Sequence, residues 1–204
     1  MEVLVVTGGI GSGKSEVCKM LQRKYGCGLY NADQRVKLLY DRHRTLLADI
    51  ENLLGESLRD DDGKFIPTRL SARIFSDKDL LRQVEELVFP ALTEDFEEWS
   101  KDFAGDRFVV FESATILEKP QLKGFGDKIV LVDADIETRL ERACARDSAS
   151  KENISVRMQN QKLMNSISSG AALPEVDAVI RNDGTLDELQ DTVVGVIEKL
   201  YGNL

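Results

Sequence analysis

Short apolar runs rich in β-branched residues recur along the chain, and longer segments of mixed polarity separate them. Four of the runs span residues 2–6, 108–111, 128–132 and 178–180, and a weaker fifth run spans 28–30. Short continuous apolar runs are typical of strands buried on both faces of a parallel sheet. The pattern therefore predicts five buried strands.

Segments with the periodicity of amphipathic helices lie between these runs. They span residues 15–24, 136–146 and 186–201, and Thr185 is placed to cap the last of them. Strands that alternate with helices form a parallel sheet with helices on both faces. We therefore expect an α/β fold of three layers around a five-stranded parallel sheet.

Two stretches interrupt this alternation. Residues 34–101 show helical periodicity without a strong strand pattern, and residues 147–173 are polar with serine-rich ends. We interpret the first stretch as a helical substrate-binding insert and the second as a small helical lid. The remaining residues, 1–33, 102–146 and 174–204, form the predicted nucleotide-binding core.

A glycine-rich motif follows the first predicted strand at once. The sequence Gly8-Gly9-Ile10-Gly11-Ser12-Gly13-Lys14-Ser15 fits G-x-x-x-x-G-K-[ST], the phosphate-binding loop. The glycines let the backbone curl so that its N–H groups point at an anion, and the next helix adds its positive dipole end. In such loops the lysine reaches the β- and γ-phosphates and the serine binds Mg²⁺. The motif therefore predicts ATP and Mg²⁺ as cofactors.

The rest of the chain narrows the class of nucleotide-binding protein. The D-x-x-G and N-K-x-D motifs of GTPases are not found in their expected places, and no apolar run ends in the Asp-Glu pair of motor ATPases. Phosphoryl transfer to a bound acceptor remains, and this reaction needs a base at the acceptor hydroxyl. Asp33, just past the weak strand, is placed to take that proton, to hold Mg²⁺ through water, or to cap the following helix.

Arginines supply the candidate cations. Arg139, Arg142 and Arg146 are spaced by three and four residues, which puts them on one face of a helix. Like charges at this spacing repel each other, so the face favours a bound anion such as ATP. Arg139 fits a solvated surface position equally well. Arg157 lies in the predicted lid, which would exclude water from bound ATP.

Composition limits the partners. The 204 residues are 42% hydrophobic, enough for one substantial core with a small appended subdomain. With 27 basic and 36 acidic residues the net charge is 27 − 36 = −9, which argues against nucleic acid or an anionic membrane as a partner. The chain starts without the pattern of a signal peptide, and its three scattered cysteines suit a reducing compartment. We therefore expect a cytoplasmic protein.

The motifs together resemble those of the dephospho-CoA kinase family along nearly the whole chain. Residues 7–15 match the family's T-G-G-I-G-S-G-K-S, and residues 30–33 match its I-D-A-D segment with Asn31 in place of the first Asp. Further matches are the arginine-containing segment at 69–75, the helix into the lid at 142–147, R-x-x-x-Q at 157–161 and the N-D-G turn at 182–184. Phe89-Pro90 replaces a His-Pro pair, and residues 112–118 keep only the outer acids of D-x-P-L-L-F-E.

The resemblance implies that ATP phosphorylates the ribose 3′-hydroxyl of dephospho-CoA, which gives CoA and ADP in the last step of CoA biosynthesis. It implies catalytic roles for Asp33, the base, and for Lys14, Arg142 and Arg146. ATP would be bound by residues 8–15, Glu16, Arg142, Arg146 and Asn182. Dephospho-CoA would be bound by Asp33, Arg69, Arg73, Glu112 and Arg157, and Mg²⁺ by Ser15 and Asp33. A monomer or small homo-oligomer is expected.

Two other functions stay open on the sequence alone. A kinase of the same fold would act on a nucleoside monophosphate or another small metabolite, since a fold does not fix a substrate. A regulatory protein would hydrolyse ATP slowly, but Asp33 and the arginines argue against it. Arg69 and Arg73 would in another interpretation only form surface salt bridges with nearby acidic residues.

Overall fold

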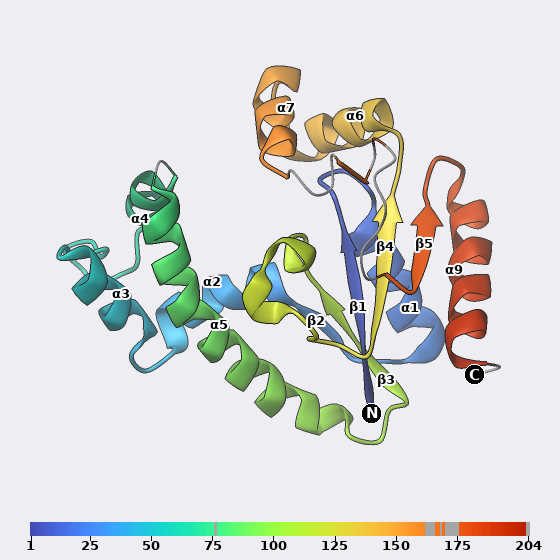
Figure 1. The fold of residues 1–204 in the computed structure, drawn as a ribbon, viewed down its shortest axis with the longest axis horizontal. Helices are drawn as coiled ribbons and strands as arrows, with labels where there is room; N and C mark the ends of the chain where they lie inside the picture. The colour runs from blue at the N-terminus through green and yellow to red at the C-terminus, as the bar shows by residue number, and fades with distance from the viewer. Residues whose placement is uncertain (76, 162–165, 168, 170–175, 203–204) are drawn as a thin grey trace. The chain divides into compact units, whose positions relative to one another are not determined.

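The protein is described from a computed structural model, which covers residues 1–75, 77–161, 166–167, 169 and 176–202. In chain order its strands and helices are β1 Glu2–Gly8, α1 Lys14–Tyr25, β2 Leu29–Asn31, α2 Ala32–Arg42, α3 Leu46–Leu54, α4 Pro67–Ile74, α5 Lys78–Ser100, η1 Lys101–Phe103, β3 Phe108–Glu112, η2 Ile116–Glu118, η3 Pro120–Leu122, β4 Lys128–Asp133, α6 Ile136–Asp147, α7 Lys151–Gln159, β5 Ala178–Arg181 and α9 Leu186–Tyr201 (Figure 1). The chain divides into two compact units, Met1–Asn31 with Phe103–Leu204, and Ala32–Asp102.

The first unit contains the predicted five-stranded sheet. All of its strand pairs are parallel, in the order β2-β3-β1-β4-β5. Parallel strands end at one common edge of the sheet, which is where open α/β folds bind their ligands. Asn31, Gly8 and Glu112 lie at that edge, at the ends of β2, β1 and β3. The α/β fold is confirmed.

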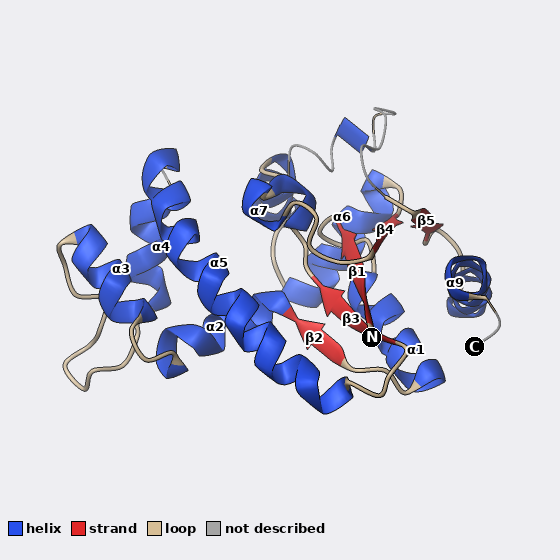
Figure 2. Cartoon of the chain, turned by 60° about the horizontal axis from the view of Figure 1, so that its bottom comes forward, coloured by secondary structure: helices blue, strands red, loops and turns tan. Residues whose placement is uncertain are grey.

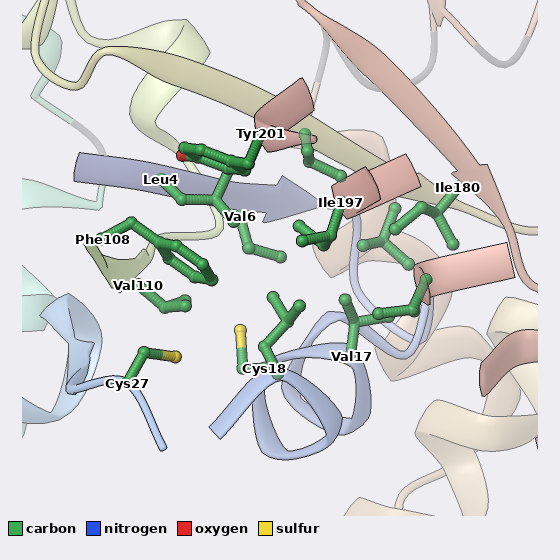
Figure 3. Close-up of a cluster of buried hydrophobic side chains, with 14 of the residues drawn as sticks. Leu4, Val6, Val17, Cys18, Cys27, Phe108, Val110, Ile180, Ile197 and Tyr201 are labelled. Atoms are coloured by element: carbon green, nitrogen blue, oxygen red, sulfur yellow. The ribbon is translucent and has the colours of Figure 1, made fainter. Parts of the chain in front are cut away.

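The core of this unit lies between the sheet and the two helices α1 and α9. Figure 3 shows Val17 and Cys18 of α1 pointing toward Leu4 and Val6 of β1, with Ile197 of α9 close by. These side chains are at most 2% exposed, so the cluster excludes water. Burial raises the pKa of the Cys18 thiol well above its ordinary value, which keeps it protonated and unreactive. The packing anchors both ends of the loop between β1 and α1.

The second unit is an assembly of helices. Helices α2, α3 and α4 each pack on α5, and no β-strand lies within the described residues of this unit (Figure 2). Arg35 of α2 donates two hydrogen bonds of 2.7 Å to the carboxylate of Asp95 on α5, a bidentate ion pair. No helix of the described residues is long and apolar enough to cross a bilayer.

Helix boundaries agree closely with the sequence pattern, with one correction. Helix α9 spans the predicted residues, and Thr185 and Glu188 cap it reciprocally. Helix α2 begins at Ala32, so Asp33 lies within its first turn and does not cap it. A carboxylate in the first turn is favoured by the helix dipole. The predicted lid contains α7, but its residues 162–165, 168 and 170–173 lie outside the described residues.

Candidate active site at the phosphate-binding loop

The loop between β1 and α1 is packed so closely that it needs its glycines. A Cβ atom at Gly11 would lie 2.0 Å from the carbonyl oxygen of Arg139, and one at Gly13 would lie 2.1 Å from Nδ2 of Asn182. Both glycines also have positive φ angles, 77° and 91°. Nδ2 of Asn182 donates a 2.9 Å hydrogen bond to the carbonyl of Ser12. Asn182, a predicted nucleotide-binding residue, thus holds the loop just before the start of α1.

Gly11→Ala is expected to destabilise the protein and to weaken ATP binding, because the methyl group meets backbone atoms that cannot move aside cheaply. Strain and overpacking together predict a loss of about 2–5 kcal/mol. Gly55→Ala is the matched control, since Gly55 has φ 69° and open space around its Cβ position, and it should lose only about 1–2 kcal/mol. Urea unfolding midpoints measure both variants. Equal losses would show that close packing at Gly11 has no energetic weight.

Arg139 is an internal support of this loop. Its side chain is 0% exposed, so the solvated position considered from the sequence is wrong. Its Nε donates a 3.1 Å hydrogen bond to the carbonyl of Ile10, and its Nη1 lies 3.7 Å from Oδ1 of Asp133. Burial lowers the pKa of Arg139, and the Asp133 carboxylate acts in the opposite direction. The helical spacing of three arginines gave no signal that one of them points inward.

A second polar cluster joins the loop to the ends of β2 and β3. The Ser15 hydroxyl donates to Oε1 of Glu112 at 2.5 Å, and Nδ2 of Asn31 donates to Oε2 at 2.6 Å. Glu112 is only 4% exposed, and both of these donors are uncharged. A buried carboxylate is normally paired with a cation or a metal ion. Glu112, expected to bind the acceptor, therefore lies beside the serine that is predicted to bind Mg²⁺.

The other predicted arginines of α6 and α7 already have partners. Arg146 and Arg157 both donate to the Asp147 carboxylate, with Nη1 of Arg157 at 2.6 Å. The hydrogen bonds from Arg146, and then the one from Arg157, lower the pKa of Asp147. Nη1 of Arg142 donates to the carbonyl of Asn182 at 2.8 Å. Asp147, at the end of α6, thus supplies Arg146 and Arg157 with a counter-charge that the spacing of the arginines did not reveal.

The remaining predicted residues divide between the two units. Lys14 and Glu16 stand in the first turn of α1, and the Glu16 carboxylate forms a 2.7 Å ion pair with Arg23. Asp33, Arg69 and Arg73 belong to the second unit. Within that unit, Arg69 donates to the carbonyl of Arg59 at 2.6 Å, and Arg73 forms a 2.9 Å ion pair with Glu56.

Comparisons with known proteins decide the family. The family model described as dephospho-CoA kinase matches residues 2–188. The chain belongs to the dephospho-CoA kinase family. A dephospho-CoA kinase of Chlorobaculum tepidum is 37% identical over 201 residues, which cover 96% of this chain and 93% of that protein. Membership in this family makes the protein a phosphotransferase that uses ATP.

Solved structures support the fold. A Thermus thermophilus protein named TT1252 aligns with a TM-score of 0.79 and 25% identity, over 98% of both chains. A dephospho-CoA kinase from Campylobacter jejuni aligns with a TM-score of 0.63 and 20% identity, over 97% of this chain and 96% of that one. Both alignments extend over nearly the whole chain, so the helical second unit is included in the similarity.

Proposed function

We propose that the protein transfers the γ-phosphoryl group of ATP to the ribose 3′-hydroxyl of dephospho-CoA, and so completes CoA biosynthesis. The observation that carries this proposal is the phosphate-binding loop of a dephospho-CoA kinase family member, with Ser15 bonded to the buried Glu112 carboxylate. The reaction needs bound ATP, charge stabilisation at the transferring group, and a base for the acceptor hydroxyl. Each need has candidate residues on this chain.

The loop between β1 and α1, together with the start of α1, would bind ATP. The N-terminus of α1, capped by Gly13 in a left-handed conformation, directs backbone N–H groups toward an anion. Lys14 would contact the β- and γ-phosphates, and Arg142 and Arg146 would stabilise the transferring group, while Arg157 would contact dephospho-CoA. Arg146 donates to the Asp147 carboxylate, so contact with a phosphate would require it to exchange one anionic partner for another.

Mg²⁺ fits the oxygen donors next to Lys14. The Ser15 hydroxyl and the Glu112 carboxylate are hard oxygen ligands, and they already lie within hydrogen-bond distance of each other. No group of three or more His, Cys, Asp or Glu side chains that could hold a metal occurs among the described residues. Two oxygen ligands from the protein can be enough for Mg²⁺, which keeps several waters and shares phosphate ligands. When bound, Mg²⁺ neutralises charge on the β- and γ-phosphates. Asp33 would reach it through water.

Residues of the second unit would bind the acceptor, dephospho-CoA. Asp33 would accept the proton of the ribose hydroxyl, and Arg69 and Arg73 would bind phosphate groups of dephospho-CoA. The Arg73 and Glu56 side chains are 50% and 45% exposed, so their ion pair is screened by solvent and costs little to break. We further propose that the protein works in the cytoplasm as a monomer or small homo-oligomer, without nucleic acid or membrane as a partner.

The test is formation of CoA, measured by mass spectrometry. Purified protein is incubated with ATP, Mg²⁺ and dephospho-CoA, and parallel reactions contain nucleoside monophosphates, shikimate or gluconate. We expect phosphorylation of dephospho-CoA to CoA and of none of the other acceptors. CoA formation should be lost when Mg²⁺ is omitted and in the variant Lys14→Met. A phosphorylated product from another acceptor, with no CoA, would contradict the proposed acceptor and would leave the family's ATP chemistry intact.

A further inference from the structure

Ile10 is the point where the phosphate-binding loop meets helices α6 and α7. Its N–H donates a 2.8 Å hydrogen bond to Oε1 of Gln161, and its carbonyl accepts the 3.1 Å bond from Nε of Arg139. Its side chain packs against a cluster of buried apolar residues on the same two helices, namely Ala143, Ile154 and Met158. The backbone N–H, the carbonyl and the side chain of Ile10 thus all contact the same part of the chain, helices α6 and α7 and the residues just after them.

The three contacts come from a single structural piece, residues 136–161, which we call the α6–α7 arm. Helices α6 and α7 pack against each other, and Gln161 follows the end of α7 by two residues. The arm therefore reaches Ile10 through Arg139 near its beginning and through Gln161 at its end. A displacement of either helix changes the surroundings of Ile10.

Burial makes these polar contacts costly to lose. Gln161 is 7% exposed and Arg139 is 0% exposed. A buried polar group needs a hydrogen-bond partner, because it cannot turn to water instead. If Gln161 lost its amide oxygen, the partly buried Ile10 N–H would lose its hydrogen-bond partner. The Gln161 bond is therefore a specific link and not a surface contact.

We propose that Gln161 is a positioning residue, which holds the phosphate-binding loop in its ATP-binding conformation through the Ile10 N–H. The link works in both directions, because coupling between two sites is reciprocal. Phosphate binding that fixes the loop also fixes the arm, which carries Arg142 and Arg146. The inference rests on ATP use by this site, and it does not depend on which acceptor is phosphorylated.

The test compares two variants. Gln161→Met keeps the volume of the side chain but removes the hydrogen-bond acceptor of the Ile10 N–H. Gln190→Met makes the same change at an exposed position of α9 and is the control. Amide exchange of Ile10 is followed by NMR in the ATP-free protein, and affinity for a non-hydrolysable ATP analogue by calorimetry. In Gln161→Met we expect Ile10 exchange to accelerate at least about tenfold, and the dissociation constant to rise about 5- to 20-fold. Gln190→Met should change neither.

A conservative variant separates positioning from general damage to the fold. Gln161→Glu keeps an oxygen acceptor, so it should restore slow exchange of Ile10, while its charge still weakens binding of the anionic analogue. The analogue should also slow amide exchange across Lys151–Gln159 in the unmodified protein and less so in Gln161→Met. Unchanged Ile10 exchange and analogue affinity in Gln161→Met would overturn the proposal, and so would failure of Gln161→Glu to restore Ile10 protection. Neither readout involves dephospho-CoA, so a wrong acceptor would leave the result unaffected.

Discussion

Asp33→Asn is expected to lower the rate of phosphoryl transfer by about 10²- to 10⁴-fold, the usual contribution of a positioned base. Asparagine keeps the shape of the side chain and its place in the first turn of α2, but it cannot accept the hydroxyl proton. ATP affinity should stay within about twofold, because the loop, Lys14 and Ser15 are untouched. Single-turnover transfer to dephospho-CoA and calorimetric binding of an ATP analogue measure the two quantities separately.

Asp41→Asn is the matched control for this variant. Asp41 lies exposed on the same helix, eight residues further on, and the substitution removes the same charge. It should leave transfer unchanged, which would show that the effect of Asp33→Asn does not come from the net charge of α2. Transfer at a normal rate in Asp33→Asn would mean that Asp33 is not the base.

The strand, loop and helix of the phosphate-binding motif could be predicted from sequence because their signals are local. A buried run, a glycine-rich motif and an amphipathic helix follow one another within residues 2–24, and each physical requirement falls on adjacent positions. The three-residue strand β2 gave the weakest pattern, because Leu29–Asn31 is too short to show a period. Chain-local patterns also placed the start of α9 at its Thr185 cap.

The supports of the loop could not be predicted because they join distant parts of the chain. Glu112 is 97 residues from Ser15 and 81 residues from Asn31, and Gln161 is 151 residues from Ile10. Helical spacing groups Arg139 with Arg142, but only the packing of α6 against the loop shows that the first is buried. The loop glycines were attributed to backbone curvature, whereas the structure adds a packing reason at Gly11.

Glu112→Gln is expected to raise the Mg²⁺ concentration needed for half-maximal transfer by about 10- to 100-fold, the usual cost of losing a group that supports a metal site. Glutamine fills the same space but removes the negative charge that would attract the ion. The carboxylate is 4% exposed and accepts from two uncharged donors, so its negative charge would favour a cation bound beside it. The transfer rate is measured as a function of Mg²⁺ concentration. Binding of Mn²⁺, used in place of Mg²⁺, is measured separately by electron paramagnetic resonance.

Stability distinguishes this metal role from a structural one. Replacing a buried charge by a neutral group of the same shape is often neutral or stabilising, so the melting temperature of Glu112→Gln should stay equal or rise. Glu141→Gln removes an exposed carboxylate from the middle of α6 and should change neither Mg²⁺ dependence nor stability. If Glu112→Gln instead lowered the melting temperature and kept the Mg²⁺ requirement, Glu112 would serve only to hold Ser15 and Asn31 together. A buried carboxylate lowers the free energy of unfolding, and only the binding of ATP and Mg²⁺ would offset this loss. A residue that destabilises the fold but binds the ion is expected where selection acts on catalysis and not on stability.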